Sequence, residues 1–334
     1  MDGPGQICGL DADSYGKKAL QTMRMLRWAD AKKADEEGAV KYVVGGSRHA
    51  QMPTYPEWDR VVLEHTYEET NYISMHQYYQ YKPSSKDPLE DFLGSAHNMS
   101  EFIDTVRSTI NYVRAKNRSS HKVYISFDEW NIWSQDAPRT EPNWVKAPHI
   151  LEDRYTFRDM LVFGGMLNAL LNHADVVKAA CLAQLVNVIA PIMTKKGGGA
   201  IRQTTFYPFR YASRYGRGET VRSITTSGTF GSMYGDAKLI DEAVTHNPET
   251  REVCVFLCNY SQKAEPVELE LRSFGDLSCK EHIVIANNDL DACNTFEHPD
   301  SVLPEQRDPV PVIGGSTAEV TLAPMSWTFS RFSY

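Results

Sequence analysis

Two adjacent acids follow an apolar, strand-like run in the segment "FDEWNIW", residues 127 to 133. They are Asp128 and Glu129, and Trp133 stands four positions after the second. In parallel α/β folds the chemistry sits at the carboxyl ends of the strands, so an acid here indicates an active site, with a turn-capping acid as the alternative. Because successive strand side chains alternate, we expect one acid to face the mouth of the site and the other to face the helix layer.

Three further side chains extend this hypothesis. In "YISMHQYY", His76 and Tyr78 stand two residues apart and therefore share one face of a strand. A lone histidine is more often structural, but an imidazole and a phenol beside an acid and Trp133 indicate a sugar site, because aromatic faces stack on sugar rings. In "CLAQLVNVIAP", the side-chain amides of Gln184 and Asn187 are candidates for a hydrogen bond to a sugar hydroxyl. The alternative is that either amide simply hydrogen-bonds a backbone group.

The elements that would position these side chains change character along the chain. Up to residue 218, short β-branched or aromatic runs alternate with amphipathic segments, which predicts βα units and a parallel sheet. From residue 219 to 334, period-two alternation predicts an antiparallel β-sandwich. The expected strands are Tyr42–Gly46, Tyr72–Tyr78, Val123–Glu129 and Val176–Val186, and the expected helices are Ser14–Ala34, Pro56–Tyr67, Met99–Lys116 and Glu152–Asn172.

The composition of the chain limits which partners it is expected to bind and where in the cell it is expected to act. The 334 residues carry a formal charge of −8 with no basic cluster, which argues against nucleic-acid or anionic-membrane partners and favours a neutral substrate. No run reaches the roughly 20 apolar residues of a membrane span, and no leader pattern is visible, so the chain is predicted to be cytoplasmic. The six cysteines and ten histidines show no metal-ligand spacing, so we expect reduced thiols and no metal. The glycine-rich "KKGGGAIR" lacks the features of a phosphate loop and is interpreted as a mobile loop.

Four segments together resemble the α-L-arabinofuranosidases of glycoside hydrolase family 51. They are "NYISMHQYY", "FDEWNIW", "CLAQLVNVIAPIMT" and "NDLDACNTFEHPDSVLP", in the family's order. The resemblance implies an α/β fold: the second half of a (β/α)8 TIM barrel, strands 5 to 8, over residues 1–218, followed by a jelly-roll-like antiparallel β-sandwich over residues 219–334.

The resemblance also implies a role for each candidate residue. Glu129 would be the nucleophile of a retaining hydrolase, with His76 and Tyr78 against the nucleophile and the sugar. Trp133 would wall the furanose subsite, and Gln184 would contact a sugar hydroxyl. The implied enzyme releases terminal α-L-arabinofuranosyl groups from oligosaccharides or polysaccharides, uses no cofactor, and forms a homo-oligomer as the full-length parent.

The same resemblance places the general acid/base outside the sequence. In the family it is the glutamate of an Asn-Glu-Met-Asp-Gly-Pro run, and this chain opens "MDGPGQI", so that glutamate would stand directly before Met1. We therefore expect a truncated chain, from an internal start codon or a gene fragment. Its turnover of ordinary glycosides should be negligible, because general acid help is worth about 10²–10⁴-fold.

Three alternatives stay open from the sequence. The first is a noncatalytic carbohydrate-binding fragment. The second is a half-enzyme that needs a separately encoded amino-terminal part. The chain is also compatible with another retaining glycosidase on the same barrel plan, because fold does not fix the sugar.

Overall fold

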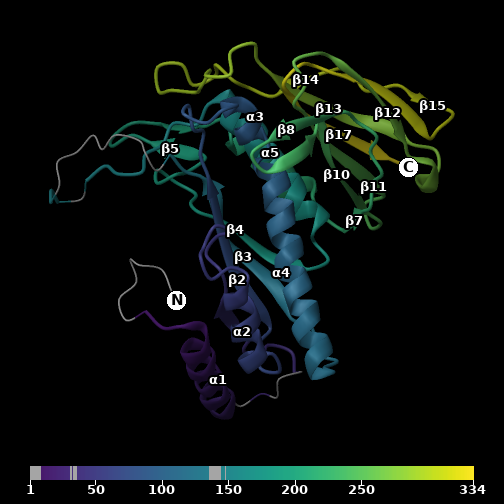
Figure 1. The fold of residues 1–334 in the computed structure, drawn as a ribbon. Helices are drawn as coiled ribbons and strands as arrows, with labels where there is room; N and C mark the ends of the chain where they lie inside the picture. The colour runs from purple at the N-terminus through teal and green to yellow at the C-terminus, as the bar shows by residue number, and fades with distance from the viewer. Residues whose placement is uncertain (1–8, 31, 33–35, 135–143, 147) are drawn as a thin grey trace. The chain divides into compact units, whose positions relative to one another are not determined.

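The computed structural model describes residues 9–30, 32, 36–134, 144–146 and 148–334 (Figure 1). Its contacts divide the chain into two units. The first consists of Met1–Tyr78, Ser100–Trp130 and Asp175–Leu182, and the second of Tyr79–Met99, Asn131–Ala174 and Ala183–Tyr334. The predicted domain boundary near residue 218 stays a prediction.

The first unit is built on a four-stranded sheet in the order β1-β2-β3-β4. The strands are β1 Val43–Gly45, β2 Tyr72–Tyr79, β3 Tyr124–Ile132 and β4 Val177–Leu182. β1 pairs with β2, and β3 pairs with β4, in parallel. The predicted parallel sheet is therefore confirmed, and its strands end where the candidate site residues stand.

Three helices accompany this sheet: α1 Ala12–Ala29, α2 Glu57–Thr66 and α4 Ser95–Asn117. Asp11 caps α1 by accepting the Ser14 N–H at 2.7 Å. Tyr15 of α1 stacks on Trp58 of α2, with ring centroids 5.5 Å apart. Phe102 of α4 meets Phe127 of β3 edge to face at 6.3 Å, so the helix layer is fixed to the strand that carries the acids.

Strand β2 shows why its polar residues share a face. Ile73 and Met75 are almost completely buried, whereas the alternate residues Ser74, His76 and Tyr78 are partly exposed. The strand period of two thus turns the apolar side chains into the core and these three polar side chains to the opposite face.

The second unit contains α3 Pro88–Leu93, α5 Phe157–Asn172 and α6 Phe206–Tyr215. Helix α5 starts later than the predicted Glu152 because Thr156 and Asp159 form a reciprocal capping box there. It is apolar on most sides and buried along nearly its whole length, as the sequence predicts for a core helix.

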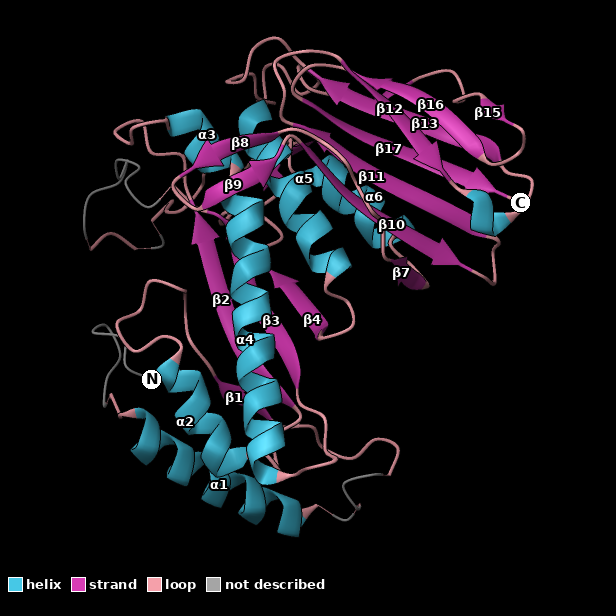
Figure 2. Ribbon diagram, turned by 45° about the vertical axis from the view of Figure 1, so that its right-hand side comes forward, coloured by secondary structure: helices cyan, strands magenta, loops and turns pink. Residues whose placement is uncertain are grey.

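Two antiparallel sheets make up the carboxyl-terminal part of the second unit (Figure 2). The larger has the order β14-β13-β17-β11-β10-β7 and the smaller the order β12-β16-β15. The strands are β7 Glu219–Val221, β10 Ile240–Asn247, β11 Glu252–Asn259, β12 Glu265–Glu270, β13 Ser278–Ala286, β14 Glu305–Gln306, β15 Val312–Ile313, β16 Thr317–Leu322 and β17 Ser326–Ser333. A hairpin of β8 Thr229–Ser232 and β9 Gly235–Lys238 and the short 3-10 helix Arg272–Phe274 complete this part.

The larger sheet is buried on both faces. Val253 and Val255 of β11 join a core cluster with Val320 of the smaller sheet, which is the arrangement of a sandwich. On the other face, Trp327 lies 5.6 Å from the Tyr211 ring of α6, and α5 packs on the same strands. The antiparallel sandwich is confirmed, with the addition that helices cover its outer face.

Two local predictions need correction. The segment "KKGGGAIR" is the turn and second strand of a hairpin between β5 Ile192–Thr194 and β6 Ala200–Arg202. The last parallel strand ends at Leu182 rather than Val186, because the chain turns and the Gln184 N–H bonds the Ile189 carbonyl at 3.2 Å. In the described part of the chain, we find no helix that is both long and apolar enough to cross a membrane.

Candidate active site

The two acids of the "DEW" segment lie in a bulge of β3. Phe127 pairs with Ala180 and Trp130 pairs with Leu182, so three steps along β3 match two along β4. The extra residue breaks strict alternation at Asp128 and Glu129. Both acids contact the imidazole of His76, so the prediction that one of them faces the helix layer was wrong.

Glu129 is held by side chains of the neighbouring strand. The Tyr78 hydroxyl donates to Glu129 Oε2 at 3.0 Å, and His76 Nδ1 lies 3.5 Å from the same oxygen. The Glu129 side chain is 48% exposed, so the carboxylate is oriented by two groups and still open to a ligand. The structure thus brings Glu129, His76 and Tyr78 together, as the sequence predicts.

Asp128 occupies the other side of the same imidazole. Its Oδ1 lies 3.1 Å from His76 Nε2 and accepts a hydrogen bond of 2.7 Å from Ser74 Oγ. The Ser74 oxygen is also 3.3 Å from His76 Nε2. Sequence reasoning missed Ser74, although its position two residues before His76 on the same strand face was a usable signal.

The surroundings hold Tyr78 and Asp128 in opposite protonation states. Burial, followed by the charge of Glu129 and the hydrogen bond to it, raises the pKa of Tyr78 well above its ordinary value, so the phenol remains a donor. Burial raises the pKa of Asp128, but hydrogen bonds from His76 and Ser74 outweigh it, and the net pKa lies below the usual value. Asp128 is therefore ionised at neutral pH.

This arrangement suits nucleophilic chemistry. Glu129 is an exposed carboxylate with one oxygen held by donors, which is the state a carboxylate nucleophile requires. Asp128 is unsuited to give up a proton, because its lowered pKa keeps it ionised. Among the described residues, no group of three histidine, cysteine or acidic side chains is placed to hold a metal ion.

Trp133 and Gln184 belong to the second unit. Trp133 is partly buried, and its backbone N–H donates to the Tyr79 carbonyl at 2.8 Å. Gln184 is exposed and lies in the turn after β4, where the Asn187 side chain is bonded to Thr194 instead of being free for a ligand. Contacts of Trp133 and Gln184 with a sugar stay predictions.

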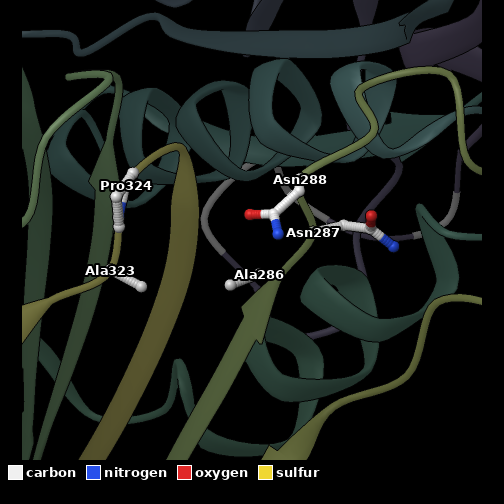
Figure 3. A pocket seen from close by; sticks show the side chains of 5 residues that line it. All are labelled: Ala286, Asn287, Asn288, Ala323 and Pro324. Carbon is white, nitrogen blue, oxygen red and sulfur yellow. The ribbon is translucent and has the colours of Figure 1, made fainter.

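A separate hollow of about 350 Å³ lies on the sandwich (Figure 3). It is lined by Ala286, Asn287, Asn288, Ala323 and Pro324. Its polar side chains are two amides, so it offers no acid, base or nucleophile for a reaction.

Known proteins resemble this chain over nearly its whole length. The sequence profile of the "Alpha-L-arabinofuranosidase C-terminal domain" family matches residues 128–326. The protein named "Intracellular exo-alpha-(1->5)-L-arabinofuranosidase 1" from Bacillus subtilis is 40% identical over 335 residues, which cover 99% of this chain and 64% of that protein. An "Exo-alpha-(1->6)-L-arabinofuranosidase" from Bifidobacterium longum is 38% identical over 345 residues. The matched region covers 98% of this chain and 63% of that protein.

The fold agrees with these sequence matches. The solved structure of AbfB, a family 51 alpha-L-arabinofuranosidase from Bifidobacterium longum, superposes with a TM-score of 0.88 at 32% identity and covers 100% of this chain. The chain covers 66% of that structure, so it spans slightly less than two thirds of the relatives it matches. By sequence profile and by fold, the chain belongs to the α-L-arabinofuranosidases of glycoside hydrolase family 51, in the part that carries the family's C-terminal domain.

Proposed function

We propose that this chain supplies the nucleophile of a retaining α-L-arabinofuranosidase that releases terminal arabinofuranosyl groups. One observation carries the proposal: Glu129 lies in the carboxyl-terminal half of the parallel strand β3, half exposed, with Oε2 held by Tyr78 and next to His76. In the proposed reaction a Glu129 oxygen attacks the anomeric carbon as the glycosidic C–O bond breaks. Water then attacks the same carbon and releases arabinose from the glycosyl-enzyme.

The other candidate residues take roles around that step. Tyr78 orients the Glu129 carboxylate and faces the ring of the bound sugar, and His76 lies against the nucleophile. We assign Trp133 to the wall of the furanose subsite, since an indole face packs well on a sugar ring, and Gln184 to a sugar hydroxyl. The support for these two assignments is the family resemblance.

A retaining reaction also needs a proton donor about 5 to 5.5 Å from the nucleophile. The family resemblance supports a glutamate that is not among the 334 residues. It likewise supports a closed (β/α)8 barrel, of which β1 to β4 would be the second half, with the sandwich beginning near residue 219. We therefore assign efficient cleavage of natural glycosides to a protein that includes the further segment present in the relatives.

The names of the relatives limit what we propose about the substrate linkage and the cellular location. Their names give both α-(1→5) and α-(1→6) linkages at nearly equal identity, so we propose an arabinofuranosyl oligosaccharide without choosing a linkage. The relatives named intracellular support a cytoplasmic enzyme. The full-length protein is proposed to be a homo-oligomer, which light scattering after gel filtration would test.

The proposal is tested with a dinitrophenyl α-L-arabinofuranoside, whose leaving group departs without a proton donor. The substrate is given to the chain alone, and to the chain joined to the segment of the Bacillus subtilis relative that it does not match. We expect a burst of dinitrophenolate from both proteins, and turnover of natural oligosaccharides from the joined protein only. Glu129→Gln should abolish the burst, because the amide is a poor nucleophile.

The matched control is Glu101→Gln on α4, which removes the same charge from an exposed helix position. It should leave the burst unchanged. A burst that survives in Glu129→Gln would end the assignment, and calorimetric sugar binding without any burst would favour a noncatalytic carbohydrate-binding protein.

A further inference from the structure

The imidazole of His76 lies between two carboxylates that follow one another in the chain. Nε2 is 3.1 Å from Asp128 Oδ1, and Nδ1 is 3.5 Å from Glu129 Oε2. The bulge between Phe127 and Trp130 makes this possible, because a regular strand would turn adjacent side chains to opposite faces. The ring is 27% exposed, so much of its hydration is replaced by these neighbours.

The hydrogen-bonding capacity of each group fixes where the protons sit. An ionised carboxylate only accepts, so the ring nitrogen facing Asp128 must carry a hydrogen. With Nε2 held by Asp128, the other ring nitrogen, Nδ1, is turned toward Glu129 Oε2.

Ser74 limits the freedom of Asp128 in the same network. Its hydroxyl donates to Oδ1 of Asp128 at 2.7 Å, the same oxygen that faces His76. Asp128 is 33% exposed and is neither a helix cap nor, in the part of the chain that the structure describes, a partner of an arginine or lysine. Its described contacts therefore lead to His76 and, through the ring, to Glu129.

We propose that Asp128 is a positioning residue of this site, acting through His76: it accepts a hydrogen bond from Nε2 and thereby holds the imidazole with Nδ1 toward the Glu129 nucleophile. The inference rests on the proposed role of Glu129 as nucleophile. Among the residues that the structure describes, the titratable side chains in contact with the His76–Glu129 pair are Asp128 on β3 and Tyr78 on β2. Tyr78 stays protonated, so Asp128 is the charged neighbour that holds the ring from its other side.

The test is the pH profile of the dinitrophenolate burst, which needs no proton donor, measured from about pH 4 to pH 8. Asp128→Asn keeps the size of the side chain and removes its charge. We expect the shape of the profile to change, so that the rate ratio between parent and variant depends on the pH. Asp104→Asn on α4 removes the same charge from an exposed ion pair with Arg107 and should leave the profile unchanged.

A double-mutant cycle identifies the route of the effect. If Asp128 acts through the ring, Asp128→Asn should change the profile in the parent but not in a His76→Asn background. Ser74→Ala, which removes one donor to Asp128, should change the profile in the same direction by a smaller amount. This second variant keeps the proposal testable if Asp128→Asn proves unstable in thermal unfolding.

Two results would overturn the inference. One is an equal loss of rate at every pH in Asp128→Asn, which marks a merely structural role. The other is the same shift of the profile in the His76→Asn background as in the parent. Neither result touches the assignment of Glu129, which falls if Glu129→Gln keeps the burst.

Discussion

Glu129 and Tyr78 form the most direct contact of the site. The phenol donates to a carboxylate oxygen at 3.0 Å, and hydrogen bonds to charged acceptors are about twice as strong as neutral ones. Because the pKa of Tyr78 is raised by burial and by the charge of Glu129, the donor persists through the working pH range. The bond fixes one carboxylate oxygen and leaves the other for attack.

Removing this donor should slow glycosylation. A hydrogen bond to a charged group is worth about 1.5–3 kcal/mol, so Tyr78→Phe should lower the burst rate of the activated substrate by roughly 10- to 100-fold. Tyr72→Phe on the same strand is the matched control, since the described contact of the Tyr72 ring is with the Tyr124 ring. Equal rates for Tyr78→Phe and the parent would remove Tyr78 from the site.

Residue patterns predicted part of this site. The spacing of His76 and Tyr78 placed both on one face of a strand, and the structure has them against Glu129. The role of Asp128 could not be predicted, because alternation assigns it to the other face and no sequence signal announces the bulge after Phe127.

At the scale of elements, α5 packs unusually closely on the larger antiparallel sheet at Gly164. A Cβ added at Gly164 would lie 2.5 Å from Trp327 Cδ1 and 3.1 Å from Cys258 Sγ, both rigidly buried. The helix can approach the sheet this closely only because the side chain is absent there.

Gly164→Ala should therefore destabilise the protein by about 1 to 3 kcal/mol, the usual cost of overpacking a core. Gly199→Ala in the β5–β6 hairpin is the control, because a Cβ there meets nothing within 4 Å. Denaturant unfolding measures both variants. Equal midpoints for the two would show that the α5 contact is looser than described.

Strand β10 carries a partly buried acid, Asp241, whose charge opposes folding. Burial raises the pKa of Asp241 to about 7, although Asn168 Nδ2 donates to it at 2.7 Å. The native state then binds more protons than the unfolded chain between about pH 4 and pH 7, so the free energy of unfolding falls as the pH rises through this window. Glu242 adds to the shift and Lys238 opposes it.

Asp241→Asn should remove this pH dependence. Relative to the parent, the variant should gain about 1 to 2 kcal/mol between pH 4 and pH 7, measured by denaturant unfolding at each pH. Asp236→Asn on the exposed strand β9 is the control and should follow the parent. If the free energies of unfolding of Asp241→Asn and the parent changed equally with pH, the raised pKa of Asp241 would be contradicted.

Long elements were predictable and their ends were not. Helices α2 and α4 and strands β1 to β3 lie where periodicity placed them. The ends of α5 and β4 depended on a capping box and a turn closed by backbone bonds, which periodicity does not register. The hairpin at "KKGGGAIR" was missed because each of its strands is three residues long.

At the scale of the whole molecule, the parallel sheet has two outer strands. β1 and β4 stand at its edges, and Val43 of β1 is 49% exposed. In the described part of the chain neither edge has a further strand beside it, and in a closed barrel each would meet one. Edges without a neighbouring strand invite association. The relatives are longer than this chain, which is consistent with further strands at these edges.

Joining the unmatched segment of the Bacillus subtilis relative should therefore suppress aggregation. We expect the joined protein to give a single species in light scattering, and the chain alone to scatter increasingly with concentration. A monomeric, non-aggregating chain alone, stable at high concentration, would show that its edges need no partner.

The central claim is that Glu129 bonds covalently to the anomeric carbon of an arabinofuranosyl group. The most direct measurement is peptide mass mapping of the joined protein after reaction with a mechanism-based arabinofuranosyl label. The account predicts one modified peptide, containing "FDEWNIW", with the added mass on Glu129. Modification of Asp128 or of any other side chain, with Glu129 unchanged, would contradict it.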